Sequence, residues 1–310
     1  MPQLKLKKFN PATMKRDRNC CMSAMRGSGK SWLIRDIMWH FRDTIPMGIV
    51  VSETEESNGF YSEMVPPSFL YEDFNMDAIQ RFMDGQKKKV KEYADPNGPY
   101  KDGDLSFRHI PNAFLIADDC MADKKLWKTK LIRDIFLNGR HRKVFFLMAV
   151  QYMMDMSVDL RANVDYVFVL MEDSIKNKER LWQQFFSIFP TFDMFCQVMD
   201  QCTENYGCMV LDRTIKSTRI EDKVFYYKAQ PRPPFRLGCW QFWEYDRLRS
   251  IERNPRPEEE EEGISDALEA VQGKRSGNKP IITVVREAPP ESNYGAPNYG
   301  YAAPQNGYGW

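Results

Sequence analysis

The sequence lacks the features of several classes of protein. No apolar run among its 310 residues approaches the roughly 18 residues that a membrane-spanning helix needs. Its seven cysteines include no pair at C-x-x-C spacing and its three histidines are scattered, so no common zinc site is indicated. Free thiols in a reducing compartment fit this cysteine pattern, and the first residues, MPQLKLKK, do not resemble a signal peptide. We therefore expect a protein of the cytosol, the nucleus or a particle assembled there, without membrane insertion.

A strong charge of either sign is also absent. The chain has 44 Lys and Arg against 43 Asp and Glu, a formal net charge of +1. Acidic residues are concentrated in the last part of the chain, which leaves a mild positive excess in the rest. This excess fits a polyanionic partner only weakly, and an ordinary solvated surface is the simpler explanation.

Composition divides the chain into three segments. Residues 1–18 are basic and are expected to form an edge strand or a solvated N-terminal arm. Residues 19–252 alternate compact apolar runs with amphipathic stretches and are expected to form one domain. Residues 253–310 begin with a run of five Glu and end in a sequence of low complexity, so we expect an acidic linker and a disordered tail.

The most informative stretch is residues 24–31, which read AMRGSGKS. They match the phosphate-binding pattern G-x-x-x-x-G-K-[ST] except at its first position, where Ala24 replaces glycine. Such a loop wraps backbone N–H groups around phosphates, its lysine reaches the terminal phosphates and its hydroxyl holds Mg²⁺. Ala24 is tolerated if its φ is negative and strained if its φ must be positive. The residues expected to bind ATP are Arg26, Gly27, Ser28, Gly29, Lys30 and Ser31, with Ser31 also a Mg²⁺ ligand.

The flanks of this loop favour a nucleotide site over the alternative, a glycine-rich surface turn. Residues 19–22 form a short apolar run that suits the preceding strand. Residues 31–42 carry their apolar side chains on one helical face. Strand, loop and helix is the order that a phosphate-binding loop requires.

A second part of the site is expected at residues 113–119, which read AFLIADD. The five apolar residues predict a buried strand that delivers Asp118 at its carboxyl end, where this carboxylate can hold Mg²⁺ opposite Ser31. Asp119 can polarise the water that attacks the γ-phosphate. Many such ATPases have Glu at this position, so with the shorter Asp either the loop sits closer or activity is lower.

A further apolar strand is predicted at residues 144–150, and Gln151 follows it. An amide at this point can sense the γ-phosphate or the attacking water, or it can simply end the strand. Alternating strands and helices predict an α/β fold with a mainly parallel sheet flanked by helices. An additional strand between the two nucleotide-site strands is the layout of P-loop NTPases of the ASCE type. Because ligands bind at the carboxyl ends of such strands, we expect the loop, Asp118, Asp119 and Gln151 to converge.

Taken together, these motifs resemble one family. The sequence is similar to the virion DNA-packaging ATPases of nucleocytoplasmic large DNA viruses, the poxvirus-type branch of the FtsK–HerA superfamily. The resemblance covers roughly residues 19–230. It is carried by residues 27–31, 115–119, 138–141 before the strand ending at Gln151, 160–165 and 225–229.

The resemblance implies an ATP- and Mg²⁺-dependent motor that translocates double-stranded DNA into a capsid. Its partners would be DNA, bound without sequence preference, other copies of the chain in a homo-oligomeric ring, and capsid or other virion proteins. Its location would be the virion or the viral factory in the host cytoplasm. Such rings usually use an arginine from the neighbouring subunit, for which Arg161 is the first candidate, ahead of Arg140 and Arg142. DNA phosphates would be contacted by residues 87–91.

Two alternatives from other classes remain open at this stage. One is a P-loop kinase acting on a small molecule, although no Arg-rich lid segment stands out and paired carboxylates suit water activation better. The other is a nucleotide-gated scaffold without motor activity, which the departures at Ala24 and Asp119 would favour.

Overall fold

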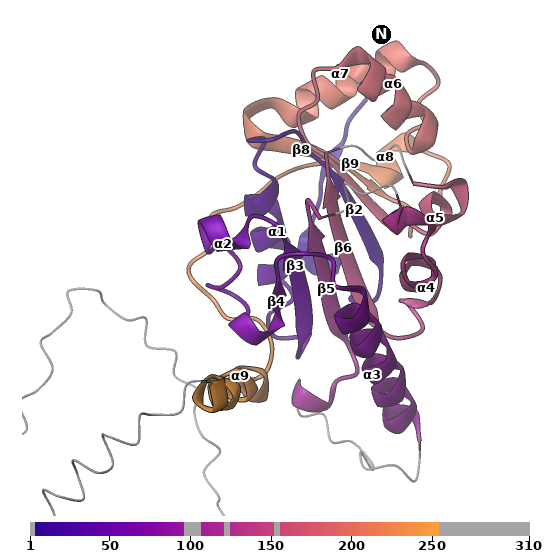
Figure 1. Cartoon of the computed structure of the whole chain (residues 1–310). Helices are drawn as coiled ribbons and strands as arrows, with labels where there is room; N and C mark the ends of the chain where they lie inside the picture. Colours follow the sequence, from indigo (N-terminus) through magenta and orange to yellow (C-terminus); the bar gives the residue numbers. More distant parts are fainter. Residues whose placement is uncertain (1–3, 96–106, 121–124, 152–155, 254–310) are drawn as a thin grey trace, which may run out of the picture. The chain divides into compact units, whose positions relative to one another are not determined.

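The computed structural model describes residues 4–95, 107–120, 125–151 and 156–253. A nine-stranded sheet runs through this part of the chain in the order β1-β9-β8-β7-β2-β6-β5-β3-β4 (Figure 1). The acidic linker and tail expected after residue 253 lie outside the described residues. The strands are β1 Lys7–Lys8, β2 Asn19–Ser23, β3 Gly48–Ser52, β4 Leu70–Tyr71, β5 Ala113–Asp118, β6 Val144–Val150, β7 Tyr166–Val169, β8 Gly207–Asp212 and β9 Val224–Lys228.

Neighbouring strands in the sheet are parallel except for the two pairs that include β8. Strand β6 lies between β2 and β5, with Cys21 opposite Met148 and Leu115 opposite Phe146. The predicted additional strand is therefore present between the two strands that lead to the nucleotide motifs. The expectation of a P-loop NTPase fold of the ASCE type is confirmed.

Helices pack on both faces of the sheet. Helices α1 and α9 lie over one face, and α3, α4, α6 and α7 lie over the other (Figure 1). Residues 87–91, for which the resemblance implied a contact with DNA phosphates, lie on α3. The helices are α1 Lys30–Trp39, α2 Glu55–Asn58, α3 Met76–Ala94, α4 Lys130–Asn138, α5 Val158–Ala162, α6 Ile175–Gln184, α7 Phe192–Thr203, α8 Ile220–Lys223 and α9 Trp240–Arg253.

Two hydrophobic cores form because the central strands are covered on both sides. In β5, Leu115 and Ala117 belong to the core under α3 and α4, while Phe114 and Ile116 belong to the core under α1. All four side chains are fully buried. A strand buried on both faces reads as a continuous apolar run, which is the pattern that identified β5 in the sequence.

The contact between β3 and β5 depends on Gly48. A Cβ at this position would lie 2.3 Å from the carbonyl oxygen of Phe114 and equally close to its ring. Only glycine permits this separation, and β3 then continues in register with β5 until Ser52 lies opposite Asp118.

The basic segment at the N-terminus is not a separate arm throughout. Lys7 and Lys8 form β1, which pairs with the edge strand β9. Phe9 is 4% exposed and packs edge-on against Phe168, at 5.6 Å between ring centroids, and Met14 is fully buried. The edge-strand alternative therefore holds for this segment, because two apolar side chains anchor it to the sheet. No break separates residues 7–14 from the domain that was expected to begin at residue 19.

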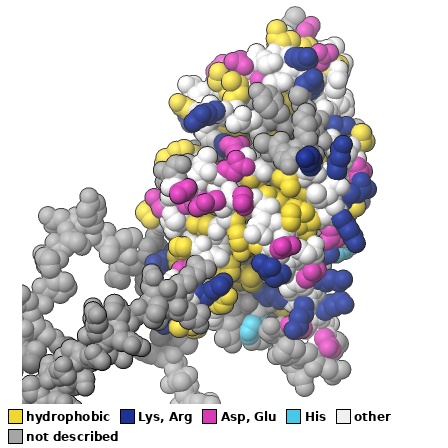
Figure 2. Space-filling view, in the orientation of Figure 1, with side chains coloured by type: hydrophobic (Ala, Val, Ile, Leu, Met, Phe, Trp, Pro, Cys, Tyr) yellow, Lys and Arg dark blue, Asp and Glu magenta, His cyan; other side chains and the backbone are white. Residues whose placement is uncertain are grey.

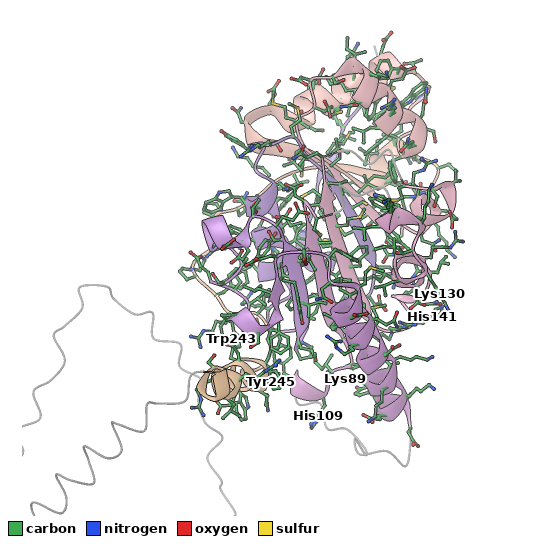
Figure 3. All side chains as sticks on the ribbon, in the orientation of Figure 1. Lys89, His109, Lys130, His141, Trp243 and Tyr245 are labelled. Atoms are coloured by element: carbon green, nitrogen blue, oxygen red, sulfur yellow. The ribbon has the colours of Figure 1, made fainter. Side chains whose placement is uncertain are left out.

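Helix α9 packs back on the domain. Phe242 is 4% exposed, and the Trp243 indole N–H donates to the Leu237 carbonyl at 2.8 Å. Figure 3 shows Trp243 and Tyr245 on this helix. Within the described ranges, no helix combines the length and apolarity required to cross a membrane.

Candidate nucleotide-binding site

The predicted phosphate-binding loop occupies residues 24–29, between the end of β2 and the start of α1. The Ala24 N–H donates to the Val150 carbonyl at 3.2 Å, which ties the loop to β6. Gly27 and Gly29 have φ values of 78° and 95°, so the two glycines adopt a backbone conformation that other residues avoid. Ala24 is not among the described residues with positive φ. The departure from the usual motif at Ala24 therefore introduces no backbone strain.

Helix α1 begins with the backbone groups that an anion requires. Gly29 is its N-cap and supplies no side-chain hydrogen bond, so the first N–H groups of the helix are not capped by a side chain. Uncapped N–H groups and the helix dipole together favour a phosphate at this point. Leu33, Ile34 and Ile37 are buried against the sheet, which fixes the direction in which the helix points.

The two carboxylates expected at the end of β5 meet the loop lysine. Asp118 is the last residue of β5 and is 4% exposed. The Lys30 Nζ lies 2.9 Å from Asp118 Oδ1 and also contacts Asp119 Oδ2. Asp119 has a φ of 56°, and its N–H donates to the Ala149 carbonyl of β6 at 3.1 Å. One ammonium group therefore joins the two separate motifs of the predicted site.

A tyrosine that the sequence did not single out completes this cluster. The Tyr61 hydroxyl donates to Asp118 Oδ2 at 2.8 Å, and Tyr61 is 2% exposed. Glu55 holds the tyrosine in place by accepting from the Tyr61 N–H at 2.8 Å. Tyr61 lies in a polar stretch with no helical or strand periodicity, so no sequence pattern pointed to it.

Burial sets the electrostatics of Asp118. Desolvation raises the pKa of this carboxyl, while Lys30 and the Tyr61 hydrogen bond act in the opposite direction. The pKa of Tyr61 is raised well above its ordinary value by burial and by the neighbouring Asp118, so its hydroxyl remains a donor. Lys30 and Tyr61 thus counter the cost of placing this carboxylate in the interior.

The remaining predicted site residues lie in two places. Gln151 is exposed and follows β6 directly, so it lies at the same edge of the sheet as Asp118. Ser31 is the second residue of α1 and is partly exposed. Arg161 lies on α5, which leads to the start of β7 at the opposite edge of the sheet. The structure therefore groups Lys30, Ser31, Asp118, Asp119 and Gln151 at one edge and does not bring Arg161 to them.

The donor set at this edge fits Mg²⁺. Hydroxyl and carboxylate oxygens are the ligands that this hard cation prefers, and Ser31 and Asp118 are the residues that would hold it. Asp119 Oδ1 is buried and, among the described residues, has no hydrogen-bond partner, so an oxygen remains available for a bound water. Nucleotide phosphates would supply the other ligands beside the N-terminus of α1.

Comparison with known proteins places the chain among proteins of large DNA viruses. It is 34% identical over 248 residues to uncharacterized protein L437 of Acanthamoeba polyphaga mimivirus, covering 77% of this chain and 82% of the relative. It is 35% identical over 233 residues to uncharacterized protein 015R of Frog virus 3, covering 74% of this chain and 67% of the relative. The chain belongs to this family of large-DNA-virus proteins. The relationship to such viruses expected from the sequence is confirmed, and no protein-family model matches the sequence.

The solved structures that resemble this chain share little sequence with it. The DNA-packaging ATPase B204 from Sulfolobus turreted icosahedral virus gives a TM-score of 0.49 at 14% identity, covering 70% of this chain and 100% of that chain. The cytoplasmic domain of the type VII secretion ATPase EccC from Thermomonospora curvata gives 0.42 at 15%, covering 70% and 26%. At these identities the likeness concerns the fold alone, which the strand order and the loop already establish.

Proposed function

We propose that this protein is an ATP-hydrolysing motor that translocates double-stranded DNA and packages a viral genome into its capsid. The observation that carries the proposal is the meeting of Lys30 with Asp118 and Asp119 at the carboxyl edge of the sheet. Membership of a family of large-DNA-virus proteins and the ASCE strand order support the same conclusion. The protein would act in the virion or in the viral factory.

Each residue of the cluster has a role that its position supports. The N–H groups at the start of α1 bind phosphate oxygens, and Lys30 moves from the carboxylates to the terminal phosphates when ATP enters. Ser31 and Asp118 would hold Mg²⁺, which would supply positive charge to neutralise the phosphates. Asp119 accepts a hydrogen bond from the attacking water and orients it, and Gln151 contacts the same water or the γ-phosphate.

Arg161 fits a role in a neighbouring subunit rather than in its own site. Arg140 and Arg142, the other two candidates, are engaged by Asp165 at 2.7 Å and by Asp134 at 2.6 Å. Within the described ranges the guanidinium of Arg161 forms no ion pair, and its helix lies at the sheet edge away from Lys30. We assign it as the arginine that stabilises transition-state charge across the interface of a homo-oligomeric ring.

A basic surface over α3 and α4 supports contact with DNA phosphates. Figure 2 shows Lys and Arg side chains gathered on the side of the molecule where these helices lie, and Figure 3 places Lys89 and Lys130 there. Lys89 is partly buried, and desolvation lowers its pKa, so the exposed neighbours are better suited to bind phosphate. We call this the α3–α4 basic surface, and its exposed lysines are Lys87, Lys88, Lys91, Lys128 and Lys130.

The test is ATP turnover by the full chain with and without duplex DNA. We expect DNA of any sequence to stimulate turnover, with a stimulation that falls as salt rises. Lys30→Ala should weaken ATP binding and abolish turnover, whereas Asp119→Asn should retain binding and lose turnover. Lys176→Ala, which removes an exposed charge on α6, is the matched control and should behave as the wild type. ATP turnover that is the same with and without duplex DNA would exclude the motor. The remaining functions would then be a small-molecule kinase and a nucleotide-gated scaffold.

A further inference from the structure

An aromatic side chain from a distant part of the sequence lies against the phosphate-binding loop. A Cβ built on Gly29 would lie 3.5 Å from Cδ1 and 3.7 Å from Cβ of Tyr206. Tyr206 immediately precedes β8, which is antiparallel to β7, so β8 begins at the edge of the sheet where β2 and β5 end. The topology therefore brings the tyrosine to the edge where Lys30 meets the carboxylates.

Core packing does not account for the position of this side chain. Tyr206 is 70% exposed, although it is one of the largest apolar side chains of the chain. The φ of Tyr206 is 63° and that of Asn205 is 52°, a backbone conformation that residues other than glycine adopt uncommonly. The next residue, Gly207, passes so close to the Cys202 carbonyl that a Cβ would lie 2.3 Å from its oxygen. The chain thus adopts an unfavourable backbone turn that leaves an aromatic ring exposed beside the loop.

A second exposed aromatic residue flanks the same glycine. Trp32 is the third residue of α1 and is 57% exposed, whereas the next two residues of the helix, Leu33 and Ile34, are buried against the sheet. The residue at this helical position lies on the same side as the N-cap residue, which here is Gly29. Tyr206 lies where a Cβ on Gly29 would touch it, so both rings border the first turn of α1, and both are exposed.

We propose that Tyr206 and Trp32 bind the base of the nucleotide by stacking. The proposal rests on the proposed function, because it takes the loop at Gly29 as the site of the phosphates. With the phosphates at the start of α1, the sugar and base must extend outward over the adjacent surface, which these rings border. Aromatic rings stack with bases through their faces, and an exposed ring offers such a face without rearrangement of the core.

The experiment compares two ligands that share phosphates but differ in the base. Equilibrium binding of ATP and of inorganic tripolyphosphate is measured by calorimetry on the full chain in Mg²⁺ buffer. We expect Tyr206→Ala and Trp32→Ala each to raise the Kd for ATP by about 5- to 100-fold and to leave the Kd for tripolyphosphate unchanged. Tyr206→Phe keeps the ring and should bind ATP as the wild type does.

Lys30→Ala separates failure of this inference from failure of the proposed function. It should weaken the binding of both ATP and tripolyphosphate, because it removes a phosphate contact and leaves the aromatic rings in place. The base site is overturned, and the nucleotide site stands, if Lys30→Ala weakens ATP binding while Tyr206→Ala leaves it unchanged. The same conclusion follows if Tyr206→Ala lowers the affinities for ATP and for tripolyphosphate equally. If neither ATP nor tripolyphosphate binds the wild type, both proposals fail. Thermal melting checks that each variant is folded, which the exposure of both side chains favours.

Discussion

Replacing Tyr61 with Phe tests how the site holds Asp118, the carboxylate that we propose binds Mg²⁺. The substitution retains the buried ring and removes only the hydroxyl that donates to Asp118 at 2.8 Å. A hydrogen bond to a charged group contributes about 1.5–3 kcal/mol, and solvent cannot replace it here because Asp118 is 4% exposed. Lys30 remains beside the other oxygen, so we expect the free energy of unfolding at pH 7 to fall by about 1–2 kcal/mol.

The same substitution should change how the stability of the protein depends on pH. Burial already raises the pKa of Asp118, and the Tyr61 hydrogen bond lowers it, so losing the hydroxyl raises the pKa further. Because burial favours the neutral form of Asp118, the contribution of this carboxyl to the free energy of unfolding is fully present at acid pH. It is lost as the pH rises through the pKa of Asp118 in the folded protein. The stability difference between Tyr61→Phe and the wild type should therefore shrink at acid pH, where both carry a neutral carboxyl.

The assay is the pH profile of Mg²⁺-dependent ATP turnover, with denaturant unfolding at two pH values. If Asp118 holds Mg²⁺ as proposed, it must be ionised to do so, and the acid limb of the profile should therefore move to higher pH in Tyr61→Phe. Tyr71→Phe on β4 is the matched control, since Tyr71 is partly exposed and is not the hydroxyl that contacts Asp118. An acid limb that stays in place in Tyr61→Phe would refute the reasoning.

Three further predictions concern other parts of the molecule. Gly48→Ala should lower the free energy of unfolding by about 3 kcal/mol in denaturant titration, because its Cβ would meet Phe114. The control Gly85→Ala on α3 has open space around its Cβ and should raise the free energy of unfolding. Equal effects of the two substitutions would contradict the packing argument. Lys87→Ala with Lys91→Ala should reduce the salt dependence of DNA binding by about two units of slope; an unchanged slope would exclude these lysines. Arg161→Ala should be inactive alone and regain turnover when mixed with Lys30→Ala, and mixtures without activity would argue against an arginine acting between subunits.

The motifs predictable from the sequence are those whose chemistry is local. A phosphate-binding loop needs its glycines, lysine and hydroxyl within eight residues, and β5 carries its carboxylates directly after an apolar run. The position of β6 between β2 and β5 was expected from the layout of ASCE-type P-loop NTPases, whereas the order of the other strands was not predicted. The N-terminal pairing was left open, since β1 has only two residues and the segment is anchored by just two buried side chains, Phe9 and Met14.

Contacts between distant residues could not be predicted in this way. Tyr61 and Asp118 are 57 positions apart, and nothing in the residues around Tyr61 distinguishes it from other loop tyrosines. Asp36, fully buried on α1, accepts from Arg232 at 2.6 Å, a pair separated by 196 positions. Such pairs are set by the tertiary arrangement of the sheet and its helices, which a single sequence does not specify residue by residue.

The electrostatics of the site link its two halves. Lys30 is shared between Asp118 and Asp119, so a phosphate that attracts Lys30 removes the positive charge that faces both carboxylates. Asp118 is too buried for water to replace that charge, and its pKa is already raised by burial. On the proposed function, Asp118 and Ser31 would hold a divalent cation, and its charge would compensate for the departure of Lys30 from the carboxylates. We therefore expect the binding of the triphosphate and the binding of Mg²⁺ to be coupled through Lys30, with neither tight without the other.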